Sequence, residues 1–233
     1  QERKYPIGIQ TFSRIIREGY IYVDKTDLVW QLAHFAKFVF LSRPRRFGKS
    51  LLTSTLDSYF RGEKELFEGL KIMQLEQDWK LYPVLHIDLS VIKGLQNAEE
   101  IRNRLMLLLE SYTEEYGSDD LAFSPGSKLE GLIRRAYKLT GMQVAVIIDE
   151  YDVPMAKALG TPYYDKVRDM IEHMLSYVCK TNDNVKAVVL SGCLYTVKNS
   201  TYTGVNNIQP YTVLSPIYAS SIGSHLRKCR LMI

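Results

Sequence analysis

The sequence predicts a three-layer α/β fold, in which a mainly parallel central sheet is flanked by helices. Short β-rich runs alternate with longer helical runs along the chain, as they do in parallel sheets covered by helices. Residues 143–148 form an apolar run rich in β-branched side chains, which is typical of a strand buried on both faces. The composition, 46% hydrophobic and 24% charged, is that of an ordinary globular protein and argues against disorder.

The expected elements follow this alternation. Strands are predicted at residues 38–42, 83–90, 143–148 and 185–190. Helices are predicted at 50–60, 98–116, 128–139 and 163–180, where apolar residues recur three and four positions apart. We expect the packed domain to run from about residue 20 to about residue 210, with boundary errors of a few residues.

Charge and cysteine content narrow the class of protein. The net charge of +4 is too small to indicate a nucleic-acid binder by itself. Cys179, Cys193 and Cys229 are odd in number and widely spaced, which predicts neither a disulfide framework nor a metal site and favours a reducing compartment. No apolar run reaches the roughly 18–20 residues that span a bilayer, so we expect a soluble, cytoplasmic protein.

A basic loop lies between the first predicted strand and the helix that follows it. At this position the unpaired amides and the dipole of the helix N-terminus face an anion. Gly48 allows close approach of the backbone, Lys49 can reach the β- and γ-phosphates, and the Ser50 hydroxyl can ligate Mg²⁺. The predicted nucleotide-binding residues are Arg43, Pro44, Arg45, Arg46, Phe47, Gly48, Lys49, Ser50 and Leu51.

The loop departs from the usual phosphate-loop pattern at its first position. That pattern has a glycine five residues before Gly48, where this chain has Arg43. The arginines of the loop can supplement the backbone amides as donors to phosphate. The alternative interpretation of a Gly-Lys-Ser sequence is a basic, solvated turn before a helix; the flanking strand and apolar helix favour phosphate binding.

Two carboxylates end the predicted strand 143–148. Asp149 is expected at the carboxyl end of a central strand, where it can hold Mg²⁺, and Glu150 follows in position to deprotonate an attacking water. The structural alternative is a buried strand that ends in exposed acids. Asp152 can cap the next turn. His86, within an apolar run, is expected to be a hydrogen-bonded core residue and neither a ligand nor a base.

These residues resemble those of the bacterial AAA-ATPase-like domain family, which is often fused to a C-terminal PD-(D/E)XK nuclease-like domain. The resemblance is carried by residues 5–10, 22–26, 42–52 and 149–152, with Pro154, Gly204, Asn206 and Asn207, and it extends to about Gly223. It implies an ASCE-type P-loop fold over residues 1–223, Lys49 and Ser50 as phosphate and Mg²⁺ contacts, and Glu150 as catalytic base. It also implies that residues 22–26 lie near the nucleotide base, although their composition alone predicts a strand and turn.

Two segments depart from that family. Similar proteins tend to have an arginine three residues after Gly192, where this chain has Tyr195. If that arginine senses the γ-phosphate in relatives, turnover here is expected to be slow or to depend on a partner. The alternative is a tolerated change, with one of the loop arginines as the substitute. Residues 224–233 form an atypical tail. Restoring one T in a back-translation after Gly223 gives Phe-Thr-Ser-Glu-Glu-Val, the family-like continuation. We therefore hypothesise a single-base deletion that removed the nuclease-like partner domain from this chain, which sequencing of the native locus would test.

Three functions are compatible with these residues. The first is an ATPase that uses ATP and Mg²⁺ to drive or regulate an appended nuclease-like domain. The second is a nucleotide-dependent switch with little turnover. The third is a nucleic-acid-binding protein whose arginine loop contacts the phosphate backbone, with an affinity that falls steeply with salt. The third leaves Asp149 and Glu150 without a role and ranks last.

Overall fold

The computed structural model describes residues 4–42, 48–118, 121–179 and 183–192 of the chain. Several of the predictions made above concern residues outside these ranges. The residues concerned are the loop residues Arg43, Pro44, Arg45, Arg46 and Phe47, together with Cys193, Tyr195, Gly204, Asn206, Asn207, Cys229 and the tail 224–233.

The four described strands form one parallel sheet. They are β1 (Phe38–Ser42), β2 (Val84–Asp88), β3 (Val144–Asp149) and β4 (Val185–Gly192), in the spatial order β1-β4-β3-β2. The four predicted strands are therefore confirmed to within two residues at each end. Because β4 lies between β1 and β3, the strand before the basic loop and the strand with the acidic end are separated by a single strand, as the family resemblance implies.

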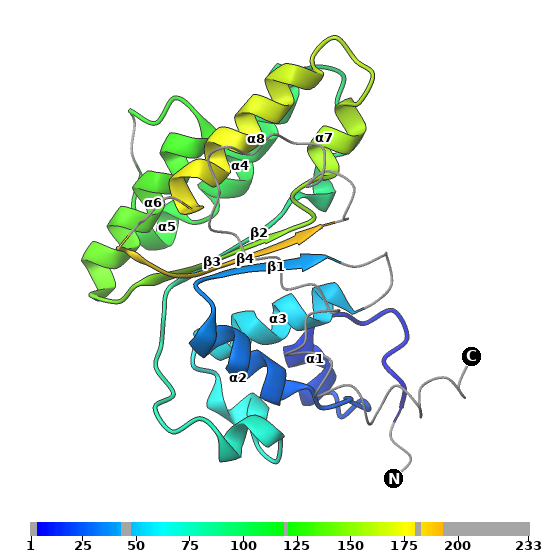
Figure 1. Cartoon of the computed structure of the whole chain (residues 1–233), viewed down its shortest axis with the longest axis vertical. Helices are drawn as coiled ribbons and strands as arrows, with labels where there is room; N and C mark the ends of the chain where they lie inside the picture. Colours follow the sequence, from blue (N-terminus) through cyan, green and yellow to red (C-terminus); the bar gives the residue numbers. More distant parts are fainter. Residues whose placement is uncertain (1–3, 43–47, 119–120, 180–182, 193–233) are drawn as a thin grey trace.

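Helices cover both faces of the sheet, which gives the predicted three layers (Figure 1). One face carries α1 (Phe12–Arg17), α2 (Thr26–Phe35) and α3 (Lys49–Phe60), with the short 3₁₀ turns η1 (Lys64–Phe67) and η2 (Lys71–Gln74). The other face carries α4 (Ala98–Glu110), α5 (Thr113–Tyr116), α6 (Pro125–Thr140), α7 (Val153–Ala158) and α8 (Tyr164–Cys179), and η3 (Leu89–Val91) directly follows β2.

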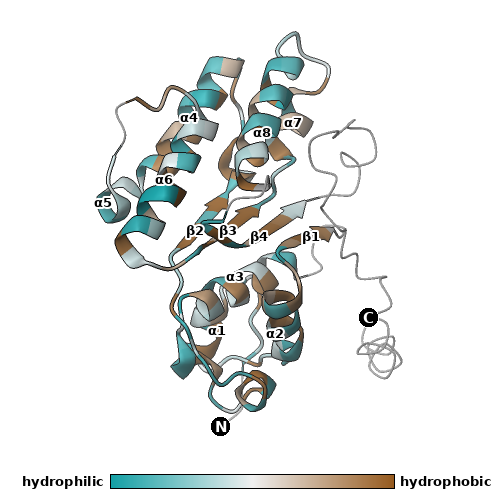
Figure 2. Cartoon of the chain, turned by 60° about the vertical axis from the view of Figure 1, so that its left-hand side comes forward, coloured by the Kyte–Doolittle hydropathy of each residue, from teal (hydrophilic) through white to brown (hydrophobic). Residues whose placement is uncertain are grey.

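Two apolar cores result from the alternation of side chains along the strands. Val146 and Ile148 face the core shared with α4, α6 and α8, whereas Ala145 and Ile147 face the core shared with α2 and α3. All six residues of β3 are buried, as the sequence predicts for a strand covered on both faces. Figure 2 shows the apolar strands at the centre and hydrophilic residues on the outward surfaces of the helices. Among the described residues, no helix combines the length and apolarity needed to cross a membrane.

Local signals fix the ends of the longer helices. Helix α6 begins with a capping box, in which Ser124 and Ser127 exchange hydrogen bonds, and it ends at Gly141 with a φ of 67°. Helix α4 begins at Asn97, whose side chain accepts a hydrogen bond from the Glu100 amide. The sequence placed the start of α6 three residues too late because Pro125 was not used as a first-turn residue.

Two predictions of secondary structure and one domain boundary are wrong. The single helix expected at 98–116 is two helices, α4 and α5, with a turn at Ser111 and Tyr112 between them. The strand expected from the composition of residues 22–26 is absent: residues 22–25 have no regular structure, and Thr26 begins α2. The packed domain also starts before residue 20, because Phe12 of α1 is completely buried.

Candidate functional site

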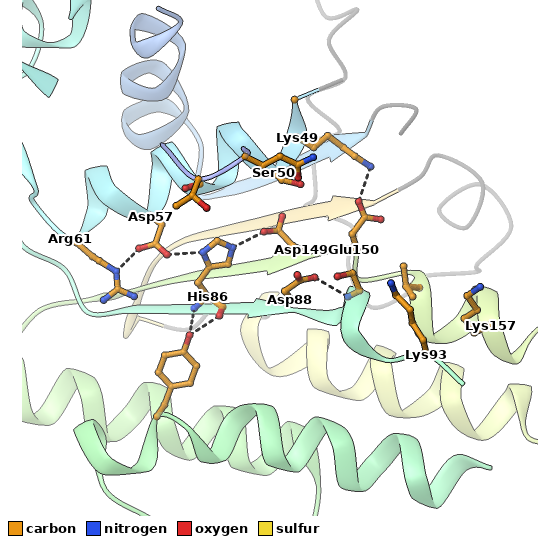
Figure 3. Close-up of a pocket in the computed structure, with 17 residues that line it drawn as sticks. Lys49, Ser50, Asp57, Arg61, His86, Asp88, Lys93, Asp149, Glu150 and Lys157 are labelled. Carbon is orange, nitrogen blue, oxygen red and sulfur yellow. Dashed lines mark hydrogen bonds and ion pairs between the residues drawn. The ribbon is translucent and has the colours of Figure 1, made fainter. Parts of the chain in front are cut away.

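A pocket of about 970 Å³ lies where the N-terminus of α3 meets the carboxyl ends of β2 and β3 (Figure 3). Ligands of open α/β sheets bind at such strand ends. The lining residues come from five stretches of the chain. They are Gln10, Thr11, Gly48, Lys49, Ser50, Ser54, Asp57, Arg61, His86, Asp88, Ser90, Lys93, Tyr112, Asp149, Glu150, Val153 and Lys157.

Gly48 shapes the entry to α3. It occupies the N-cap position in the left-handed region, with φ 74° and ψ 19°, which a glycine adopts without steric cost. A Cβ on Gly48 would meet no atom within 4 Å, so the backbone conformation and not a lack of space favours glycine there. The first helical residue is Lys49, and Ser50 follows it in the pocket wall. The first turn of α3 therefore directs its free amides toward the pocket.

The Lys49 side chain connects the ends of two strands, β3 and β4, with α3. Its ammonium donates a hydrogen bond to the Gly192 carbonyl at the end of β4, with an Nζ–O distance of 3.1 Å. It also pairs with Glu150 directly after β3, where Nζ lies 3.5 Å from Oε1. Only 7% of Lys49 is exposed, so both contacts form in a largely desolvated position where charges interact more strongly than in water.

Asp149 is held by three side chains. Ser191 donates a hydrogen bond to Oδ1 at 2.6 Å, Thr53 donates to Oδ2 at 3.0 Å, and His86 lies with Nε2 2.6 Å from Oδ2. Only 8% of Asp149 is exposed. Hydrogen-bond donors offset the cost of burying a polar group, and these three contacts fix the orientation of the carboxylate.

Glu150 has an unusual backbone conformation. Its φ of 52° makes it the one described non-glycine residue in the left-handed region. Its amide donates to the Ser191 hydroxyl at 3.2 Å, and the Tyr151 amide donates to the Ser191 carbonyl at 3.1 Å. These contacts hold the turn after β3 and direct the Glu150 side chain toward Lys49. Such strained positions cluster at functional sites.

His86 bridges two carboxylates. Its Nδ1 lies 2.6 Å from Asp57 Oδ2, and its Nε2 lies 2.6 Å from Asp149 Oδ2. Because ionised carboxylates only accept hydrogen bonds, both ring nitrogens donate and the ring is a cation. Burial lowers the pKa of His86, but its hydrogen bonds to Asp149 and Asp57 outweigh burial and raise that pKa to about 9.

Arg61 completes this row of alternating charges, because its guanidinium pairs with Asp57. Burial raises the pKa of Asp57, but the hydrogen bond from His86 and the charge of Arg61 outweigh it, and the net shift is downward. The row therefore runs from the far end of the pocket to Asp149 with cation and anion in turn. The prediction that His86 is a core residue is wrong in one respect: it is hydrogen-bonded, as expected, but it lines the pocket and contacts Asp149.

Tyr112 closes the free edge of β2 beside the pocket. Its hydroxyl donates to the His86 carbonyl at 2.6 Å and accepts from the His86 amide at 2.9 Å. In the described part of the sheet β2 is an edge strand, and its outward backbone groups have no strand partner there. The Tyr112 hydroxyl takes the place of such a partner. This contact coincides with the turn that separates α4 from α5.

The chemistry of the pocket suits a nucleoside triphosphate with Mg²⁺. A helix N-terminus and a buried lysine suit phosphate oxygens. Mg²⁺ is commonly bound by one or two protein oxygens together with substrate phosphates and water, and the Ser50 hydroxyl and the Asp149 carboxylate are oxygens of this type in one pocket. The pocket volume lies within the range of ligand sites.

The structure brings together five of the predicted site residues: Gly48, Lys49, Ser50, Asp149 and Glu150 all line the pocket. Leu51 does not line it; its side chain is half-buried and packs on the core beneath α3. Residues 22–26 do not line it either, because Asp24 and Thr26 bind the backbone of η2 through the Lys71 and Ile72 amides. Asp152 stands at the N-cap position of α7, outside the lining.

Several lining residues were not predicted from the sequence. Among them are Gln10, Thr11, Asp57, Arg61, His86, Lys93, Tyr112 and Lys157; Thr53 and Ser191 hold Asp149 from behind. One signal was available: strand periodicity puts His86 and Asp88 on the same face of β2, at the strand end nearest the predicted acids. The remaining residues are distant in sequence from the motifs and carry no local pattern.

The parallel order β1-β4-β3-β2, with a helix N-terminus facing an acidic strand end, defines a P-loop NTPase-like fold. A family model described as "Predicted AAA-ATPase" matches residues 6–202, and the chain belongs to this AAA-ATPase-like family. Membership supports a nucleotide-binding, ATPase-like module.

A curated protein of Azotobacter chroococcum mcd 1, described as an uncharacterized protein in the vnfD 5′ region, is similar to the chain. The two are 36% identical over 215 residues, which cover 91% of this chain. The chain spans 41% of the length of that relative.

Proposed function

We propose that the chain hydrolyses ATP in the pocket between α3 and the ends of β2 and β3. Lys49 binds the β- and γ-phosphates, Ser50 and Asp149 hold Mg²⁺, and Glu150 is the catalytic base. Gly48 and the loop residues Arg43 to Phe47 complete the phosphate site through backbone amides and side-chain donors.

One contact carries the proposal. The 3.5 Å pair between Lys49 and Glu150 joins residues 101 positions apart and unites the phosphate-binding end of α3 with the acidic end of β3. Asp149 lies in the same pocket wall and is already directed by three donors. A solvated basic turn, or a strand that merely ends in acids, does not account for a buried lysine between these elements.

The reaction follows from these positions. A water oxygen forms a bond to the γ-phosphorus while the bond between that phosphorus and the bridging oxygen breaks, and ADP leaves with the electron pair. The proton of the attacking water passes to Glu150. Lys49 is shared between Glu150 and the γ-phosphate, so phosphate binding draws its charge away from the base. Mg²⁺, when bound, neutralises charge on the β- and γ-phosphate oxygens.

Calorimetric titration with MgATP and steady-state phosphate release test this function. Lys49→Ala is expected to lose at least about tenfold in MgATP affinity, which corresponds to about 1.4 kcal/mol. Glu150→Gln is expected to retain MgATP binding and to lose phosphate release. Lys138→Ala is the matched control, since this exposed lysine of α6 is not among the pocket residues. Equal affinity of wild type and Lys49→Ala would refute the site.

The same measurements separate the alternatives. Tight MgATP binding without phosphate release would favour the switch with little turnover. Nucleic-acid affinity that falls with salt and ignores ATP would favour the third function.

We further propose that ATP turnover drives or regulates an appended nuclease-like domain. The family resemblance supports this coupling, and the relative is long enough to contain a further domain, since this chain spans 41% of it. DNA cleavage by a full-length relative, measured with and without ATP, tests the coupling. Cleavage that is unchanged by ATP and by substitution of the equivalent lysine would contradict it.

A further inference from the structure

The pocket extends past Glu150 on the side away from His86, toward the loop after β2 and toward α7. This part of the lining contains Ser90, Lys93, Val153 and Lys157. Figure 3 shows Lys93 with its amine toward Glu150, whereas Lys157 lies farther out. The roles proposed for Lys49, Ser50 and Asp149 leave these four residues without a function.

Negative charge develops on the transferring phosphoryl group and on the leaving ADP during hydrolysis. Cations placed around the γ-phosphoryl group stabilise that charge and greatly accelerate the reaction in P-loop enzymes. Most of the cations that line the described part of the pocket are already paired. Lys49 contacts Glu150 and the Gly192 carbonyl, Arg61 pairs with Asp57, and both nitrogens of His86 face carboxylates. Within the described residues, no ion pair engages Lys93 or Lys157.

The loop that carries Lys93 is firmly placed. Asp88 ends β2 and caps η3 by accepting a hydrogen bond from the Ser90 amide at 2.8 Å. Leu89 and Ile92 are buried in the core on either side of this turn, with exposed fractions of 0% and 1%. The Lys93 amide then donates to the Val91 carbonyl at 3.0 Å. Lys93 itself is exposed, so an anchored backbone presents its flexible side chain at the pocket rim.

Acidic residues surround this region. Asp88 and Asp149 stand opposite each other in the register of β2 and β3, and Glu150 follows directly. A triphosphate adds further negative charge at the same strand ends. Lys49 approaches this charge only from the α3 side. The ammonium of Lys93, on the open side of Glu150, offsets it from the other side.

We propose that Lys93 is a catalytic residue that contacts the γ-phosphoryl group in the transition state from the side opposite Lys49. This inference rests on the proposed ATPase function and adds a charge-stabilising residue to it. Lys93 is exposed, so its removal should change folding little, and we expect its contact to strengthen as negative charge develops in the transition state.

The test compares Lys93→Ala, Lys93→Arg and Lys138→Ala with wild type. Turnover is measured together with the affinities for MgADP and for MgADP–aluminium fluoride, which mimics the transferring phosphoryl group. For Lys93→Ala we expect kcat and the analogue affinity to fall by about 30-fold or more, while KM and the MgADP affinity change less than about threefold. Lys93→Arg keeps the charge and should restore most of both.

Lys138→Ala is the control, because Lys138 is an exposed lysine of α6 outside the pocket lining; it should change the analogue affinity less than about threefold. Equal loss of MgADP and analogue affinity in Lys93→Ala, or an unchanged kcat, would overturn this inference alone. Wild-type protein that binds no MgATP would overturn the proposed function and this inference with it. Equal melting temperatures of the variants confirm that each one folds.

Discussion

His86 and Asp149 are joined by a 2.6 Å contact between Nε2 and Oδ2, across two neighbouring strands of the sheet. The second ring nitrogen faces Asp57 at the same distance. A cation thus stands between the acid of the candidate Mg²⁺ site and an acid of α3. Since both partners are anions, the charged form of the ring is favoured by folding.

The first prediction is that this cation makes stability depend on pH. The folded pKa of about 9 is above the ordinary value of 6.5, so the stabilisation is fully present below pH 6.5 and is lost as the pH rises through about 9. We expect the free energy of unfolding to fall by about 1–3 kcal/mol over that window in metal-free buffer. Urea unfolding at a series of pH values measures it.

His86→Gln is the matched variant for this measurement, because an amide can still donate a hydrogen bond but carries no charge. Other groups that titrate in the alkaline range contribute equally to both proteins and cancel in the difference. Parallel pH profiles for wild type and His86→Gln would show that the ring is not the source.

The second prediction concerns the strained backbone at Glu150. A non-glycine residue with φ 52° costs about 1–2 kcal/mol in backbone energy, and glycine relieves that cost. Since glycine also gains entropy in the unfolded chain, we expect Glu150→Gly to be more stable than Glu150→Gln by about 0.5–1 kcal/mol. Both variants lose the negative charge that pairs with Lys49, so their difference reports mainly the backbone conformation. Thermal unfolding measures it, and equal stability of the two variants would contradict a strained Glu150.

Strong periodicity explains which parts of the fold were predictable. Strand β3 is apolar throughout, and α3 follows a basic loop, so both were located from local patterns. The six-residue helices α1 and α7 are too short to show a helical period and were missed. The apolar stripe of α4 continues as far as Tyr112, which is why one long helix was predicted. The chain instead turns at Tyr112, whose hydroxyl contacts the backbone of β2.

The candidate site was predictable where motifs carry the chemistry and not elsewhere. Lys49 and Asp149 were identified because each follows or ends an apolar element in a recognised pattern. Asp57 and His86 are 29 positions apart, and their contact depends on α3 packing beside an edge strand. No spacing rule links such a pair. Consequently the sequence indicated the acids and the lysine of the site but not the cation between the acids.

The third prediction concerns the free edge of β2. Tyr112→Phe removes the hydroxyl that both donates to and accepts from the His86 backbone, and leaves two backbone groups without this partner. We expect a loss of about 1–3 kcal/mol in the free energy of unfolding. Tyr137→Phe is the control, because Tyr137 of α6 is 39% exposed and should change stability by less than about 0.5 kcal/mol. Equal effects of the two substitutions on urea unfolding would refute a structural role of the Tyr112 hydroxyl.

The fourth prediction concerns the close packing of Gly192 against the segment after β3. A Cβ on Gly192 would lie 2.6 Å from Tyr151 Cε1 and 2.7 Å from Asp152 Oδ1, so Gly192→Ala forces a buried ring and a carboxylate to move. We expect this overpacking to cost about 1–3 kcal/mol of stability. Because the Gly192 carbonyl accepts the Lys49 hydrogen bond, the displaced strand end should also weaken MgATP binding.

Gly160→Ala separates crowding from backbone effects in that experiment. A Cβ on Gly160 meets no atom within 4 Å, but its φ of 80° is unfavourable for alanine, so this change should cost about 1 kcal/mol and leave MgATP affinity unaltered. Unfolding and calorimetry of both variants distinguish the two causes. If Gly192→Ala bound MgATP as wild type does, the end of β4 would not position Lys49, and the contact between the Gly192 carbonyl and the lysine would serve the fold alone.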